Sequence, residues 1–174
     1  MRIATLVVAI AALGFGLAHP VLAAGGGGGA GGGITRGTSS GSSYGFSADP
    51  VDPYFAKGKA LVEAKRYQEA LPYLQQAIAK DPKNADAYNL MGYATRKSGN
   101  ANGSLQYYNQ ALAIDPKHLG ANEYIGEAYL QLDRPQEAAQ HLARLDSLCT
   151  FGCTEYRMLK AAIADYKAGK KPTN

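Results

Sequence analysis

The sequence lacks the residue patterns that mark most enzyme active sites. It contains no His-Glu-x-x-His pair, no glycine-rich nucleotide fingerprint and no group of carboxylates at metal-binding spacing. Its three histidines include none in a Ser-His-Asp context, and His118, which follows an Asp-Pro pair, is expected to be a solvated turn residue. The sequence therefore predicts no catalytic residue, no metal site and no cofactor.

A concentration of charge of one sign is also missing. The 18 basic and 14 acidic residues give a net charge of +4 and are interleaved along the chain. Only Lys167, Lys170 and Lys171 form a small basic cluster, which we expect to be a solvated tail. Nucleic-acid binders more often carry a basic stripe with exposed aromatic residues, so no nucleic-acid partner is predicted.

A long apolar run occurs only at the start of the chain. Met1 and Arg2 give a positive start, Ile3 to Ala18 is almost all apolar, and Val21-Leu22-Ala23 resembles a cleavage site. This pattern predicts a secretory signal peptide over residues 1–23, cleaved after about Ala23, and an exported, periplasmic protein. A retained membrane anchor is the alternative, although the run is short for a bilayer span of roughly 20 residues.

Residues 24–50 are rich in glycine and serine. Such a segment buries too little apolar surface to offset the entropy lost on ordering, so we expect a disordered tether. A phosphate-binding loop is the alternative. It would need a preceding strand and a following Gly-Lys-Ser/Thr, and the sequence has neither.

A period of 34 residues recurs three times over residues 51–150. Glycine recurs at Gly58, Gly92 and Gly126, a small residue at Ala70, Ser104 and Ala138, and a large residue at Leu74, Tyr108 and Leu142. Two of the units close on Asp81-Pro82 and Asp115-Pro116. A fixed period of this size predicts an array of helical repeats, with units at 51–84, 85–118 and 119–150.

The spacing of the second unit resembles that of the tetratricopeptide repeat. The matching residues are Tyr88, Met91, Gly92, Thr95, Ser104, Tyr108 and Pro116. The resemblance implies an all-α fold, a right-handed superhelix of about three helix-turn-helix repeats. The third unit departs from the pattern, because Asn122 replaces the aromatic seen at Tyr54 and Tyr88, and Cys149-Thr150 replaces Asp-Pro.

Residues 151–174 should form a capping helix and a basic tail. Thr154 is a suitable N-cap, and apolar residues recur on one face of Thr154 to Ala168, as expected for an amphipathic helix. Repeat arrays need such a cap over their last apolar edge. A helix that lies on a membrane surface is the alternative.

Cys149 and Cys153 are the only cysteines, and in an exported protein such a close pair predicts a disulfide. The ring is small, so its entropic contribution is about 2 kcal/mol. Haem attachment and a redox-active pair would each need Cys-x-x-Cys. A metal site would need further ligands, of which His141 is the nearest candidate.

In the tetratricopeptide family the first helix of each unit lines a concave face on which peptide segments dock. Carried over by register, the lining positions are Phe55, Lys59, Val62, Asn89, Tyr93, Arg96, Glu123, Glu127 and Leu130. Arg96 could grip a carboxylate through two hydrogen bonds, and Glu123 and Glu127 would favour a basic group. The clamp with which some members grip an acidic chaperone peptide is absent, because its positions include Phe55, Leu90, Gly120 and Tyr124.

The resemblance therefore implies a non-catalytic adaptor of the bacterial cell envelope that holds a partner protein or peptide in the groove. The alternatives are a small enzyme or ligand-binding protein that uses the same groove, and a structural protein that self-associates. The tyrosines at helical spacing are expected to fill the core.

Overall fold

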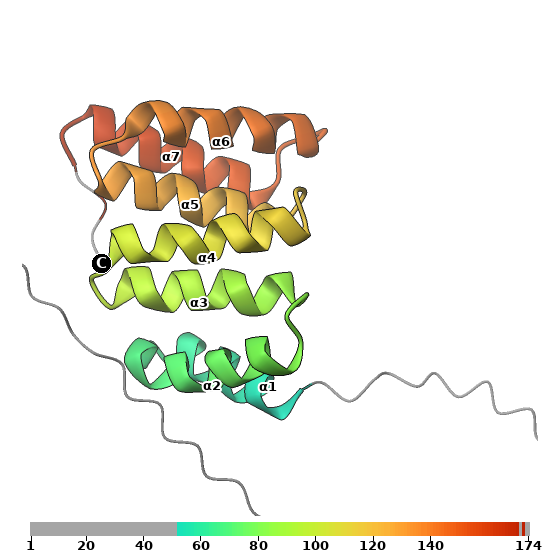
Figure 1. The fold of residues 1–174 in the computed structure, drawn as a ribbon. Coiled ribbons are helices and arrows are strands. Elements are labelled where there is room, and N and C mark those ends of the chain that lie inside the picture. The colour runs from blue at the N-terminus through green and yellow to red at the C-terminus, as the bar shows by residue number, and fades with distance from the viewer. Residues whose placement is uncertain (1–51, 171, 173–174) are drawn as a thin grey trace, which may run out of the picture. The chain divides into compact units, whose positions relative to one another are not determined.

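A computed structural model describes residues 52–170 and 172. Within these residues the chain forms seven α-helices and no strand (Figure 1). In chain order they are α1 (Pro53–Glu63), α2 (Tyr67–Lys80), α3 (Ala85–Lys97), α4 (Ala101–Ile114), α5 (Leu119–Gln131), α6 (Pro135–Leu148) and α7 (Thr154–Lys167). The predicted all-α class is confirmed. The predicted signal peptide (1–23) and tether (24–50) lie outside the described residues.

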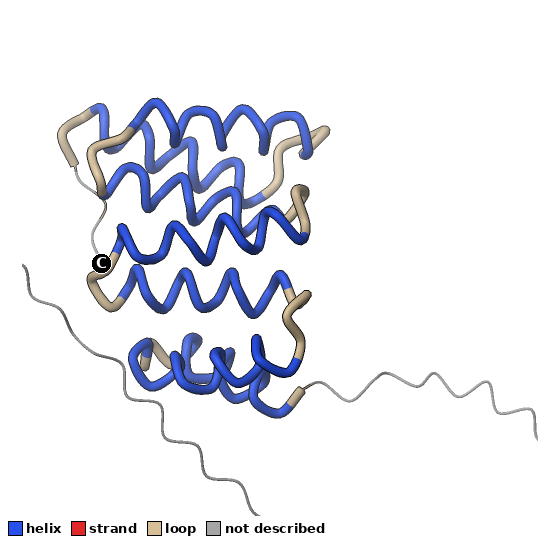
Figure 2. The backbone as a smooth tube through the Cα atoms, viewed as in Figure 1, coloured by secondary structure: helices blue, strands red, loops and turns tan. Residues whose placement is uncertain are grey.

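Consecutive helices are joined by short connections, so each helix packs beside the one before it (Figure 2). The turn within each helical pair repeats with the sequence period. Lys65, Gly99 and Asp133 lie 34 residues apart, and all three have positive φ, at 58°, 97° and 57°. This conformation is favourable for glycine and costly for other residues, yet only the middle unit uses glycine there. The backbone therefore repeats more faithfully than the side chains do.

Polar side chains cap the starts of several helices. Asp52 accepts a hydrogen bond from the Phe55 backbone N–H at 3.2 Å, and Asn84 accepts one from Ala87 at 2.8 Å. His118 caps α5 through Nδ1 and lies 3.0 Å from a carboxylate oxygen of Asp86 through Nε2. His118 is thus a helix cap, and the expectation of a solvated turn residue was wrong because the imidazole satisfies a free backbone N–H.

The periodic glycines mark places where helices approach closely. A Cβ atom on Gly58 would lie 2.7 Å from Leu74 of α2, and one on Gly92 would lie 2.6 Å from Tyr108 of α4. At Gly126 the contact comes from Leu159 of α7, at 2.6 Å, instead of from α6. The cap helix therefore supplies part of the third unit's own core.

Helix α7 packs against both α5 and α6 (Figure 1). Its Leu159 and Ile163 are buried together with Leu130, Ala138 and Leu145. The helix starts at Thr154 with Cys153 in the N-cap position and no side-chain cap, so the expectation that Thr154 is the cap was off by one residue. The apolar face of α7 thus covers the end of the array, as a cap should.

Candidate functional site

The nine predicted groove positions lie on α1, α3 and α5, the first helices of the three units, and we call this set the inner row. Lys59 is exposed, and Phe55, Tyr93 and Glu127 are partly buried. Val62 and Leu130 belong to the hydrophobic core, and Asn89, Arg96 and Glu123 are also buried. The period therefore places all nine positions on first helices, and most of these side chains are more buried than an open groove lining would be. That a partner binds there stays a prediction.

Arg96 is the centre of the inner row. Its guanidinium is 1% exposed, donates to a carboxylate oxygen of Glu127 at 2.6 Å, and reaches the Tyr108 hydroxyl at 3.4 Å. It also lies over the rings of Tyr93 and Tyr124, at 5.5 and 5.9 Å from their centroids. A buried guanidinium needs both charge compensation and hydrogen bonds, and this site provides both.

Tyrosine rings extend the cluster around Arg96 along the array. The Tyr93 and Tyr124 centroids are 4.7 Å apart, and Tyr67 meets Tyr93 edge-on at 5.9 Å. Burial raises the pKa of Tyr124 to about 12, and burial together with Tyr67 raises that of Tyr93. These phenols therefore stay neutral and present fixed rings with polar tips, a combination that suits contacts with a partner.

Glu123 and Asn89 form a second, less satisfied part of the inner row. Glu123 is 2% exposed and Asn89 is 6% exposed. One oxygen of each side chain, Oε1 of Glu123 and Oδ1 of Asn89, has no hydrogen-bond donor among the described residues. Burial, and then the carboxylates of Glu127 and Glu155, raise the pKa of Glu123 to about 8, with Arg96 opposing them.

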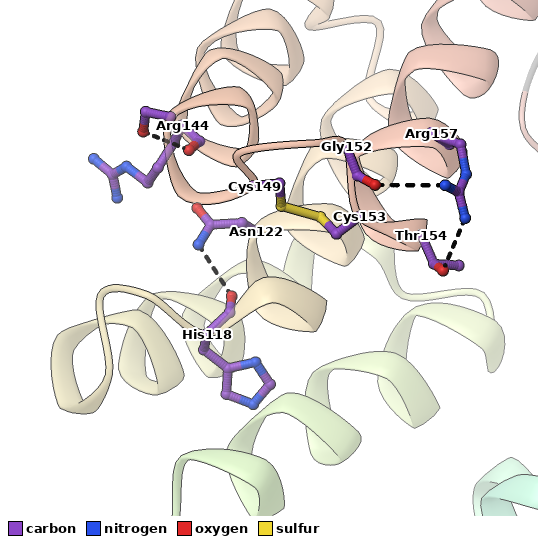
Figure 3. The surroundings of a disulfide bond; sticks show 9 residues. His118, Asn122, Arg144, Cys149, Gly152, Cys153, Thr154 and Arg157 are labelled. Atoms are coloured by element: carbon purple, nitrogen blue, oxygen red, sulfur yellow. Dashed lines mark hydrogen bonds between the residues drawn. A yellow bond between two sulfur atoms is a disulfide. The ribbon is translucent and has the colours of Figure 1, made fainter.

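The cysteines lie where α6 ends and α7 begins, and they are joined by a disulfide (Figure 3). Gly152 within the ring has φ 76°, which favours glycine, and its carbonyl accepts from Arg157 at 3.4 Å. Arg157 also donates to the Thr154 hydroxyl at 3.2 Å. The ring and this arginine together hold the start of the cap helix.

A polar pair that the sequence reasoning missed explains why Asn122 departs from the repeat pattern. Asn122 is fully buried, donates to the His118 carbonyl at 3.0 Å (Figure 3), and lies with Oδ1 3.1 Å from His141 Nδ1. Burial, and then Arg144, lower the pKa of His141 to about 4, so it is neutral and donates from Nδ1. In the sequence, the only sign of this pair was that an asparagine, Asn122, is followed 19 residues later by a histidine, His141.

The described part of the chain offers no candidate for two other classes of site, a metal centre and a membrane span. No three or more His, Cys, Asp or Glu side chains among residues 52–170 and 172 lie where they could share a metal ion. No helix in this part of the chain combines the length and apolarity that a bilayer crossing requires.

Two family models, both described as tetratricopeptide repeat, match this chain. One matches residues 55–118 and the other residues 95–163, so that together they cover more than half of the sequence. A comparison with curated proteins gives no significant match.

Solved structures of repeat proteins are similar to this chain. MamA 41-end from Desulfovibrio magneticus RS-1 is 27% identical, with a TM-score of 0.53 over 55% of this chain and 54% of that one. The chain thus spans about half the length of that structure. The Arabidopsis OM64 TPR domain is 22% identical, with a TM-score of 0.59 over 65% of this chain and 93% of that one.

A further structure is the first TPR of Spaghetti (RPAP3) bound to the HSP90 peptide SRMEEVD. It is 20% identical, with a TM-score of 0.59 over 66% of this chain and 93% of that one. At these identities the OM64 and RPAP3 structures bear on the fold alone.

Proposed function

Because the chain belongs to the tetratricopeptide repeat family, we propose that it is a non-catalytic scaffold that holds a partner protein or peptide against the inner row. The observation that carries this proposal is the cluster around Arg96. Side chains from two successive first helices, α3 and α5, are held together there by an ion pair and by the contact between the tilted rings of Tyr93 and Tyr124. Arg96 is buried and holds the rings in place, and the partly buried rings of Tyr93 and Tyr124 are the groups that a partner can contact. Rings that are already fixed lose little entropy on binding, which makes them good anchors.

We propose a peptide or extended segment as the occupant by analogy with RPAP3, which shares the fold and is bound to the HSP90 peptide SRMEEVD in its solved structure. The lysine-and-asparagine clamp is missing from this chain, so the partner should differ from an acidic chaperone tail. Lys59 on α1 is the exposed member of the inner row.

The proposed place of action is the bacterial periplasm. Two features support it, the signal-peptide pattern over residues 1–23 and the bonded cysteine pair, since disulfides persist in oxidising compartments. Fractionation of cells that express the full chain should recover a mature form in the periplasm whose first residue is about Ala24. Recovery of the uncleaved chain in the cytoplasm would refute the location and leave the scaffold proposal standing.

Photo-cross-linking in cells tests the scaffold proposal. A photoreactive residue at the exposed Lys59 should capture one discrete protein, and the same group at the exposed Gln76 of α2 should not. Tyr93→Ala, which removes an anchor ring, should abolish that capture while the helical circular dichroism is retained. Equal capture from both positions, or none from either, would contradict the proposal.

A further inference from the structure

Two buried oxygen atoms on neighbouring first helices lack hydrogen-bond donors. They are Oε1 of Glu123 on α5 and Oδ1 of Asn89 on α3, and neither has a partner among the described residues. A buried acceptor left unsatisfied costs roughly 1–3 kcal/mol, and more for a charged group. A ligand that brings donors to both atoms recovers this free energy on binding.

Asn89 and Glu123 both lie at the interface between α3 and α5. The Asn89 amide nitrogen lies 3.2 Å from the position that a Cβ atom on Gly120 would occupy. Gly120 precedes Glu123 by three residues, one helical turn, and side chains on a helix lean toward the preceding turn. The Asn89 amide therefore lies against the turn of α5 that precedes Glu123, the turn toward which the Glu123 side chain is expected to lean.

The charges around this place are mostly negative. Glu127 on α5 and Glu155 on α7 face Glu123, and both disfavour its ionised form. Arg96 on α3 is the cation that favours ionisation, but its guanidinium is already engaged by Glu127 at 2.6 Å. A positive charge from outside the chain would offset the excess of negative charge around Glu123.

We propose that Glu123 and Asn89 form a subsite for a basic side chain, lysine or arginine, of a partner held on the inner row. This inference rests on the proposed scaffold function. An ammonium or guanidinium group carries several N–H donors and no acceptor, so it satisfies both oxygens at once. A charge-assisted hydrogen bond in this buried setting is stronger than a neutral one.

Binding of a cation should be coupled to release of a proton from Glu123. The carboxyl is largely protonated below about pH 8 in the free protein, and the cation favours its ionised form. The apparent affinity for a basic ligand should therefore rise by about tenfold for each pH unit that separates the Glu123 midpoint in the complex from that in the free protein, and should level off above about pH 8.

A carboxyl-carbon NMR titration of the ¹³C-labelled full chain tests the subsite. The probes are Nα-acetyl-lysine methylamide and Nα-acetyl-arginine methylamide, and the neutral control is Nα-acetyl-norleucine methylamide. Either cation should lower the titration midpoint of Glu123 by at least about one pH unit, and norleucine should leave it unchanged. The two cations compared show whether the subsite prefers lysine or arginine.

Matched variants keep this test specific. In Asn89→Ala the cation should shift the Glu123 midpoint less, and the exposed Glu63 in the same spectra reports non-specific charge screening. The subsite is refuted if Glu123 responds equally to norleucine, shifts no more than Glu63, or does not respond. A captured partner with an unresponsive Glu123 refutes the subsite alone, whereas a responsive Glu123 without a captured partner refutes only the scaffold.

Discussion

Glu123→Gln should stabilise the protein at alkaline pH and have a much smaller effect near pH 5. In the native state burial, Glu127 and Glu155 raise the pKa of Glu123 to about 8, against an ordinary value of 4.5. Between these values the native carboxyl keeps a proton that the unfolded chain has lost. Its contribution to stability is therefore complete below pH 4.5 and is lost as the pH rises through about 8. Glutamine carries no ionisable proton, so it removes this dependence.

The size of the effect follows from the pKa difference. A gap of about 3.5 pH units between 4.5 and about 8 corresponds to roughly 5 kcal/mol at about 1.36 kcal/mol per unit. From about pH 5 to about pH 8.5, the difference in free energy of unfolding between Glu123→Gln and the native chain should grow by about 4 kcal/mol.

Urea unfolding followed by far-UV circular dichroism at several pH values measures this difference. The matched control is Glu63→Gln, which changes an exposed glutamate on α1 and should leave the pH profile unaltered. A difference between Glu123→Gln and the native chain that does not vary with pH would refute the reasoning, because it would mean that Glu123 ionises alike in the native and unfolded states.

Three further predictions concern the contacts that hold the array together. Arg96→Ala should lower the free energy of unfolding by about 3 kcal/mol because it breaks a buried ion pair. Arg66→Ala, at the exposed pair with Glu69, should cost much less, and equal losses in urea titrations would contradict the burial argument. Gly92→Ala should cost about 1–3 kcal/mol because the added methyl meets a tyrosine ring, and an unchanged thermal midpoint would show that this contact is not tight. Cys149→Ser with Cys153→Ser should lose about 2 kcal/mol and make unfolding insensitive to reductant; a native chain already insensitive to reductant would argue against the bridge.

The architecture could be predicted from the sequence because the fold requires certain residue types to recur with a fixed period. Helices can approach closely only where a residue is small, so Gly58 and Gly92 had to recur with the repeat. The register also placed Tyr93 in one row with Lys59 and Glu127, since residues at the same position of successive units face the same way.

The sequence did not show in the same way how deeply each side chain is buried or which side chains are in contact. Arg96 and Glu127 are 31 residues apart, and the pattern does not state that their side chains meet. Val62, Arg96 and Leu130 share a register position, and all three are buried although one of them carries a charge. The charge of Arg96 suggested an open position, and only its pairing with Glu127 explains how it can be buried. In the sequence, Asn122 was a departure from the repeat pattern, and the structure explains it by its contact with His141.

The contact between Leu159 and Gly126 limits where this repeat array can be truncated or fused to another protein. The first two units each supply the residue that meets their own glycine, whereas the third takes it from beyond its repeat boundary. A chimera that ends at residue 150 would leave an empty notch at Gly126 and expose Leu130 and Leu145. The smallest transferable piece at this end is therefore the helix triplet α5 to α7, and recombination that respects the 34-residue period would break it.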